Sequence, residues 1–168
     1  MVAAKKKKLN GLWIVAAIGI VLLYILRSSS KSSPAGNKNY PISDEQGQII
    51  QVLQSAGIDY DTARYWSLVS KMETGAWSSE LFRKYNNAFG MKQPQKRSTT
   101  SQGPSPSGWA TYKSLQDSTK DLLLYMREFN YPSSFPSLED QIVFMKQKGY
   151  FEEPVSTYYN LVKAWESK

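Results

Sequence analysis

The stretch RYWSLVSKMETG, residues 64–75, decides how this chain of 168 residues is interpreted. Trp66, Val69 and Glu73 are spaced i, i+3 and i+7, which places them on one face of a helix. Gly75 follows at the position where a glycine usually ends such a helix. Glu73 therefore closes an apolar stripe, and we expect its carboxylate to face the interior of the domain.

Two effects are expected to raise the pKa of Glu73. A carboxylate at a helix C-terminus meets the negative end of the helix dipole, and a partly apolar setting disfavours the charged form. A carboxyl with a raised pKa is what a general acid needs. An acid at a helix end, taken alone, is more often a solvated or ion-paired structural group, so the residues around Glu73 must decide between the two interpretations.

The composition excludes several classes of function. The chain has 21 Lys and Arg against 14 Asp and Glu, and all seven excess positive charges fall within residues 1–41, which leaves 14 of each sign from Ile42 onward. The positive charge thus lies in a tail, and we expect no nucleic-acid partner. Because the chain has no cysteine and no histidine, thiolate nucleophiles, Ser-His-Asp catalysis and metal sites built on thiolates or histidines are excluded. We expect no metal and no cofactor, and carboxylates, tyrosines and lysines must carry any chemistry.

The N-terminal region has the pattern of a membrane anchor. Residues 9–26 are apolar apart from Asn10, and as a helix they would span about 27 Å, close to the hydrocarbon thickness of a bilayer. Four lysines precede this segment and fewer basic residues follow it, which favours a cytoplasmic N-terminus. We interpret residues 1–8 as a cytoplasmic tail, 9–26 as a transmembrane helix and 27–41 as a flexible linker. A cleaved signal peptide is the alternative.

Residues 42–168 are expected to form one mainly helical domain. Capping residues, glycine stops and prolines indicate successive helices opened by Ser43, Asp61, Ser78 or Ser79, the segment 114–117, Ser137 and Pro154. Residues 92–108, which we call the flap, are rich in Ser, Thr, Pro and Gln and show no periodicity, and residues 109–112 read as a short strand. An irregular insertion of this length in a compact domain is more often functional than a plain connector.

Several sequence blocks resemble one enzyme family. Residues 72–93 read METGAWSSELFRKYNNAFGMKQ, in which Glu73-Thr74-Gly75 with Ser79, and then Asn86-Asn87-Ala88-Phe89-Gly90-Met91-Lys92, are spaced as in the glucosaminidase family of peptidoglycan hydrolases, glycoside hydrolase family 73. Two weaker blocks follow in the same order, Trp109-Ala110-Thr111-Tyr112-Lys113-Ser114 and Lys148-Gly149-Tyr150 through Pro154-Val155-Ser156-Thr157-Tyr158. The resemblance covers about residues 43–165.

This resemblance implies a lysozyme-like helical fold with a small β or irregular flap and a groove for the N-acetylglucosamine and N-acetylmuramic acid polymer. Carried over by position, Glu73 becomes the general acid that protonates the glycosidic oxygen. Glycine in the second block permits close approach of the backbone to sugar. The residues that the resemblance implies for substrate binding are Ser79, Asn87, Phe89, Gly90, Trp109, Tyr112 and Tyr150.

The sequence departs from the family pattern in one respect. The family usually carries a second carboxylate in a hairpin after the second block, but residues 81–116 contain no Asp or Glu. Three explanations stay open: attack by a group of the substrate itself, a distant acid such as Asp117 or Glu153, or a domain that binds glycan without cutting it. The same stretch forms a cationic region that suits the anionic peptide stems of peptidoglycan, and its members are Arg83, Lys84, Lys92, Lys96, Arg97 and Lys113.

The sequence thus predicts a membrane-anchored glycosidase that cleaves peptidoglycan strands, of the N-acetylglucosaminidase or lytic transglycosylase type. We expect a single-pass membrane protein whose catalytic domain is periplasmic or extracellular, or alternatively lies on the membrane of a phage particle. Its expected partners are the glycan strands and the lipid bilayer. The competing prediction is a non-catalytic peptidoglycan-binding or virion structural module with a lysozyme-like groove.

Overall fold

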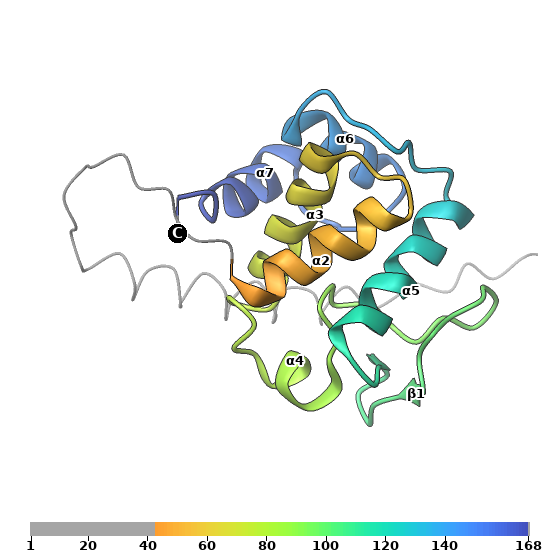
Figure 1. Cartoon of the computed structure of the whole chain (residues 1–168). Coiled ribbons are helices and arrows are strands. Elements are labelled where there is room, and N and C mark those ends of the chain that lie inside the picture. Colours follow the sequence, from red (N-terminus) through yellow and green to blue (C-terminus); the bar gives the residue numbers. More distant parts are fainter. Residues whose placement is uncertain (1–42, 168) are drawn as a thin grey trace, which may run out of the picture. The chain divides into compact units, whose positions relative to one another are not determined.

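The computed structural model describes residues 43–167 (Figure 1). Within this range the chain forms six helices, namely α2 (Asp44–Ser55), α3 (Tyr60–Glu73), α4 (Glu80–Tyr85), α5 (Leu115–Glu128), α6 (Leu138–Gln147) and α7 (Val155–Lys163). Two short antiparallel strands, β1 (Gly103–Pro104) and β2 (Ala110–Thr111), complete the ordered elements. The prediction of a mainly helical domain is confirmed for these residues.

The predicted membrane anchor cannot be compared with the structure. The expected tail 1–8, transmembrane helix 9–26 and linker 27–41 lie outside the described residues. Within residues 43–167, no helix has both the length and the apolar character needed to cross a bilayer.

Serine side chains begin most of the helices, as the sequence predicts. The hydroxyl of the serine before each helix accepts a hydrogen bond from the backbone N–H three residues later in α2, α4, α5 and α6, which involves Ser43, Ser79, Ser114 and Ser137. The predicted start of α3 at Asp61 is wrong by one residue, because Asp59 caps this helix and accepts from the N–H groups of Asp61 and Thr62. Pro154 likewise precedes α7 and does not lie in its first turn.

Helix α3 is the central element of the core. It buries nine of its 14 residues and packs against α2, α6 and α7, while α2 also packs against α5 (Figure 1). Trp66 of α3 is fully buried, and its ring lies against the rings of Phe89, Tyr131 and Tyr150. The aromatic core therefore surrounds the helix that ends in Glu73, and it fixes the direction of that helix.

A buried ion pair attaches the flap to α5. Strand β1 of the flap pairs with β2, but each strand has only two residues, so the hairpin has little stability of its own. Arg97 of the flap donates two hydrogen bonds, of 2.9 and 2.7 Å, to the carboxylate of Asp121, which is fully buried in α5. The Tyr112 hydroxyl and the Thr100 N–H donate to the same carboxylate at 2.8 and 3.2 Å.

These donors control the charge of Asp121. Burial acts to raise the pKa of the Asp121 carboxyl, but the hydrogen bonds from Arg97 and Tyr112 and the positive charge of Arg97 hold that pKa below its usual value. The carboxylate therefore stays ionised in the interior, and its four hydrogen bonds hold the flap, the segment after β2 and α5 together.

Replacing Asp121 by asparagine is expected to destabilise the protein by about 3 kcal/mol, because Arg97 would keep a mostly buried charge without its counterion. The measurement is the free energy of unfolding of the full chain by chemical denaturation. Glu128→Gln, which removes an exposed carboxylate from the same helix, is the control and is expected to change stability by less than about 0.5 kcal/mol. Equal stability of the two variants would contradict the anchoring role.

Candidate functional site

Glu73 is the last residue of α3, and a specific backbone pattern ends the helix there. The N–H of Gly75 donates to the carbonyl of Met72 at 3.2 Å, and the N–H of Ala76 donates to the carbonyl of Lys71 at 2.8 Å. This is the Schellman pattern, which requires the left-handed conformation that Gly75 adopts at φ 56°. The predicted stop at Gly75 is confirmed, and it fixes Glu73 at the C-terminal end of the helix.

The turn after Glu73 is strained. Ala76 and Trp77 continue the left-handed conformation of Gly75, with φ of 57° and 58°, at a cost of roughly 1–2 kcal/mol for each of these two non-glycine residues. The Trp77 N–H donates to the Thr74 hydroxyl at 2.9 Å, and the Trp77 indole N–H donates to the Ser70 hydroxyl at 3.1 Å. These bonds offset the strain and determine how the chain leaves α3 beside the carboxyl of Glu73.

The surroundings of Glu73 raise its pKa. Burial is the largest cause and raises the pKa of the carboxyl from 4.5 to about 7. The Tyr158 hydroxyl donates to Glu73 Oε1 at 2.7 Å and opposes this effect, whereas the negative charge of Glu153 adds to it. Among the described residues no lysine or arginine forms an ion pair with Glu73. The expected raised pKa of Glu73 is confirmed in direction.

The loop 86–91 is built by its two asparagines. The side-chain amide of Asn87 donates to the carbonyls of Met91 and Ala110 at 2.8 and 2.9 Å, and its oxygen accepts from the Met91 N–H at 3.0 Å. Asn86 adopts the left-handed conformation at φ 51° and donates to the carbonyl of Tyr112 at 3.1 Å. The asparagines thus bind this loop to β2 and to the residue after it, and they set the path of the residues between Asn87 and Met91.

Gly90 of this loop faces Glu73. Its φ of +59° is unfavourable for other residues, and a Cβ at this position would lie 3.4 Å from Glu73 Oε2. A side chain here would therefore be strained by the backbone conformation, and its Cβ would be in van der Waals contact with the carboxyl group. The glycine leaves bare backbone beside the second oxygen of Glu73, while the first oxygen is bound by Tyr158.

Phe89 and Tyr150 support this arrangement. The Tyr150 hydroxyl donates to the Phe89 carbonyl at 3.0 Å, and both rings pack against Trp66, with ring centroids 5.5 and 6.4 Å from it. Burial raises the pKa of Tyr150 well above its ordinary value, and the charge of Glu73 adds to this effect. The structure therefore brings four of the predicted residues together around one carboxyl group, namely Glu73, Phe89, Gly90 and Tyr150.

No protein-family model matches this chain, and neither a curated protein nor a solved structure matches it. The resemblance to the glucosaminidases therefore depends on the residue blocks themselves. The chemistry of the site must be argued from the surroundings of Glu73.

The other predicted substrate-binding residues have protein partners. Ser79 caps α4, and Asn87 is fully buried within its own loop. Tyr112 was expected to bind substrate. However, it is only 3% exposed, and its hydroxyl already donates a hydrogen bond to Asp121. Trp109 is half-buried, with the ammonium group of Lys92 3.5 Å from its ring centroid. The roles of these residues in substrate binding stay predictions.

Tyr158 ends the last block of the resemblance and lies at core spacing in its helix, but it was not among the residues expected to form the site. The helical spacing of α7 correctly predicted that its ring is buried, because such spacing identifies the inward face. The pattern carries no information about the hydroxyl, whose partner Glu73 lies 85 residues away in the sequence. Glu153, just before Pro154, also acts on Glu73 through its charge, and the sequence had named it with Asp117 as a candidate distant acid.

Replacing Glu73 by glutamine is expected to change how stability depends on pH. A carboxyl whose pKa is 4.5 in the unfolded chain and about 7 in the folded protein destabilises the fold as pH rises through this window, by at most about 3 kcal/mol above pH 7. The variant lacks this loss. Between pH 4 and pH 8 its stability should therefore rise relative to the wild type by up to that amount, as measured by chemical denaturation. A difference that is constant with pH would contradict the raised pKa.

Removing the Tyr158 hydroxyl is expected to raise the pKa of Glu73 above about 7, because the hydrogen bond that favours the charged form is lost. The measurement is an NMR titration of the carboxyl carbon of Glu73 in Tyr158→Phe. Tyr159→Phe is the matched control, since its hydroxyl accepts from Lys163 on the exposed side of the same helix. An unchanged titration of Glu73 in Tyr158→Phe would show that this hydrogen bond is absent in solution.

Proposed function

We propose that residues 43–167 form a lysozyme-like domain that cleaves the glycan strands of peptidoglycan, with Glu73 as the general acid. The observation that carries this proposal is the carboxyl group of Glu73, whose pKa burial raises to about 7. Such a group is still protonated in a large fraction of molecules at neutral pH, and it can give a proton to a glycosidic oxygen. The residue blocks that resemble the glucosaminidases contain this same glutamate and the glycine that faces it.

The contacts of Glu73 suit a general acid both before and after it gives up its proton. Before proton transfer, burial keeps the carboxyl neutral. After transfer, the carboxylate is negative, and the Tyr158 hydroxyl, which donates to Oε1 at 2.7 Å, stabilises that charge. The Oε2 atom lies beside Gly90, which has no side chain to contact it.

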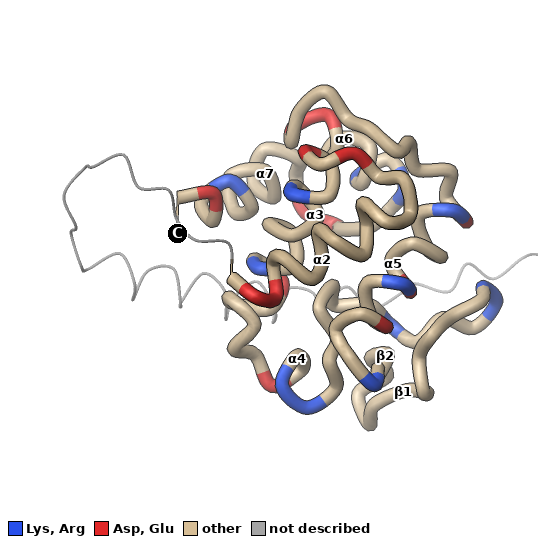
Figure 2. The backbone as a smooth tube through the Cα atoms, viewed as in Figure 1, with Lys and Arg blue, Asp and Glu red and all other residues tan. Residues whose placement is uncertain are grey.

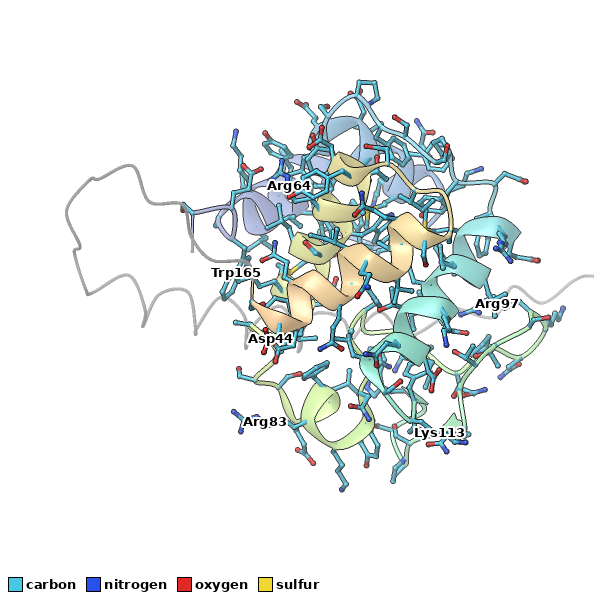
Figure 3. All side chains as sticks on the ribbon, viewed as in Figure 1. Asp44, Arg64, Arg83, Arg97, Lys113 and Trp165 are labelled. Carbon is cyan, nitrogen blue, oxygen red and sulfur yellow. The ribbon has the colours of Figure 1, made fainter. Side chains whose placement is uncertain are left out.

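The charge distribution supports an anionic partner such as the peptide stems of peptidoglycan. Helix α4, the flap and the segment after β2 carry exposed basic groups, namely Arg83, Lys84, Lys92, Lys96 and Lys113 (Figure 2). Arg83 and Lys113 point away from the helices in Figure 3. Arg97, which the sequence placed in the same cationic region, is neutralised by Asp121, so we leave it out of the proposed contact surface.

We propose further that residues 9–26 anchor the chain in a membrane, with the N-terminus in the cytoplasm and the domain outside. The same arrangement suits a phage particle that contains a membrane. In either setting the linker 27–41 would let the domain reach the cell wall from the bilayer.

One observation favours the alternative of a module that binds glycan without cutting it. Polar side chains expected to contact sugar are bound to protein groups instead, since Tyr112 donates to Asp121 and Asn87 is bound within its loop. The flap, which lies between the second and third blocks, also lacks the second carboxylate that the resembled family usually carries. In this alternative the half-buried Trp109 and the nearby lysines would hold the glycan.

The deciding experiment incubates the purified full chain in detergent with peptidoglycan sacculi and analyses the released fragments by mass spectrometry. We expect release by the wild type and a loss of about 100-fold or more in Glu73→Gln, because the proton donor is removed. Glu128→Gln, which changes an exposed carboxylate of α5, is expected to keep wild-type activity. Binding of sacculi without release by the wild type would support the alternative function, and equal release by wild type and Glu73→Gln would contradict the role of Glu73.

A further inference from the structure

Glu153 has a buried oxygen without a partner. It lies in the turn between α6 and α7, one residue before Pro154. Its Oε2 atom is buried, and no group among the described residues forms a hydrogen bond with it. Burying a carboxylate oxygen without a donor is unfavourable, so such a group in a folded protein calls for an explanation, of which a catalytic role is one.

The turn that carries Glu153 is fixed on both sides. Lys146 Nζ donates to the carbonyl of Glu152 at 2.6 Å and to that of Phe151 at 3.4 Å. The Phe151 ring stacks on Tyr158, with centroids 3.8 Å apart and planes 4° from parallel. Because Tyr158 in turn binds Glu73, the turn before Glu153 is built directly onto the surroundings of the proposed acid.

Glu153 is close enough to Glu73 for their charges to interact. Its negative charge raises the pKa of Glu73 and also that of Tyr158. Within residues 43–167, the titratable groups that interact with Glu73 are Tyr158 of α7, through a hydrogen bond, and Tyr150 and Glu153 of the turn, through their charges. From the loop 86–91, Gly90 contributes only backbone. Glu153 is therefore the second carboxyl group of this site.

The other candidate acids are already engaged. Asp117, in the first turn of α5, lies 3.6 Å from the ammonium of Lys120. Asp121 accepts four hydrogen bonds from Arg97, Thr100 and Tyr112. Of the three acids, Glu153 is the one that combines an unpaired buried oxygen with an electrostatic contact to Glu73.

We propose that Glu153 is the general base of the reaction and accepts a proton from the water that attacks the anomeric carbon. This proposal rests on the proposed function. As the bond from the anomeric carbon to the leaving oxygen breaks, the proton of Glu73 goes to that oxygen. The water oxygen bonds to the anomeric carbon, and one water proton goes to Glu153. The second proton stays on the new hydroxyl, so the product has a reducing end, and solvent returns the proton from Glu153 to Glu73.

The identity of the nucleophile determines the products. Since water is the nucleophile, the released fragments should end in reducing sugars with an inverted anomeric configuration. Fragments that end in 1,6-anhydro sugars would mean that a hydroxyl of the substrate attacks, and they would overturn the assignment of water activation to Glu153.

The first test does not depend on activity. In the full chain labelled with ¹³C at the glutamate carboxyl groups, Glu153→Gln is expected to lower the pKa of Glu73 below about 7, because a like charge is removed. Glu152→Gln is the matched control, because Glu152 is the adjacent residue and is exposed. This variant should leave the titration of Glu73 unchanged. An unchanged pKa in Glu153→Gln would show that the two carboxyl groups are not close, and would overturn the proposal whatever the activity.

The second test measures turnover of peptidoglycan fragments. Glu153→Ala is expected to lower kcat by about 100-fold with little change in KM, and azide should restore turnover by forming a glycosyl azide of inverted configuration. A purely structural role of Glu153 would give no azide rescue. Wild-type activity in Glu153→Ala, or loss without rescue, would overturn this proposal alone. An inactive wild type would overturn the proposed function and this proposal with it.

Discussion

The site depends on the burial of one carboxyl group at the end of α3. Burial raises the pKa of Glu73 by disfavouring the charged form, and the Tyr158 hydroxyl limits this rise by donating to Oε1 at 2.7 Å. The two opposing effects leave a group that titrates at about 7. Without the burial the residue would be an ordinary ionised glutamate, and without the hydrogen bond its anion would have no donor among the described side chains.

The contacts around Glu73 explain the residue types that follow it in the sequence, from Thr74 to Trp77. Gly75 allows the Schellman ending of α3, while Thr74, Trp77 and Ser70 hold the left-handed turn that follows. That turn contains two strained non-glycine residues, so the hydrogen bonds that hold it must persist if Glu73 is to keep its place. The position of the Glu73 carboxyl is thus set by the backbone turn on one side and by aromatic packing on the other.

Local signals predicted the helices well because they act over three or four residues. The serines before α2, α4, α5 and α6 cap those helices as expected, and Gly75 ends α3. Contacts between distant residues were not predictable in this way. Arg97 was read as a surface charge because its counterion Asp121 lies 24 residues away, beyond a stretch without acids. Strand β1, formed by Gly103 and Pro104, has neither alternation nor strand-forming residues, so nothing in its sequence identified it.

Asp121 and Glu153 have different hydrogen-bond partners, and this explains why we give them different roles. Asp121 meets a guanidinium, a hydroxyl and a backbone N–H, and it is therefore used entirely in holding the flap to α5. Glu153 meets no donor at Oε2, yet its turn is fixed by Lys146 and by the stacking of Phe151 on Tyr158. If Glu153 is the base, the two acids of the site are Glu73 and Glu153. Glu73 lies at the end of α3 and Glu153 just before the start of α7, and these two helices pack against each other. The flap would then carry none of the reaction's chemistry, which is consistent with its lack of any carboxylate.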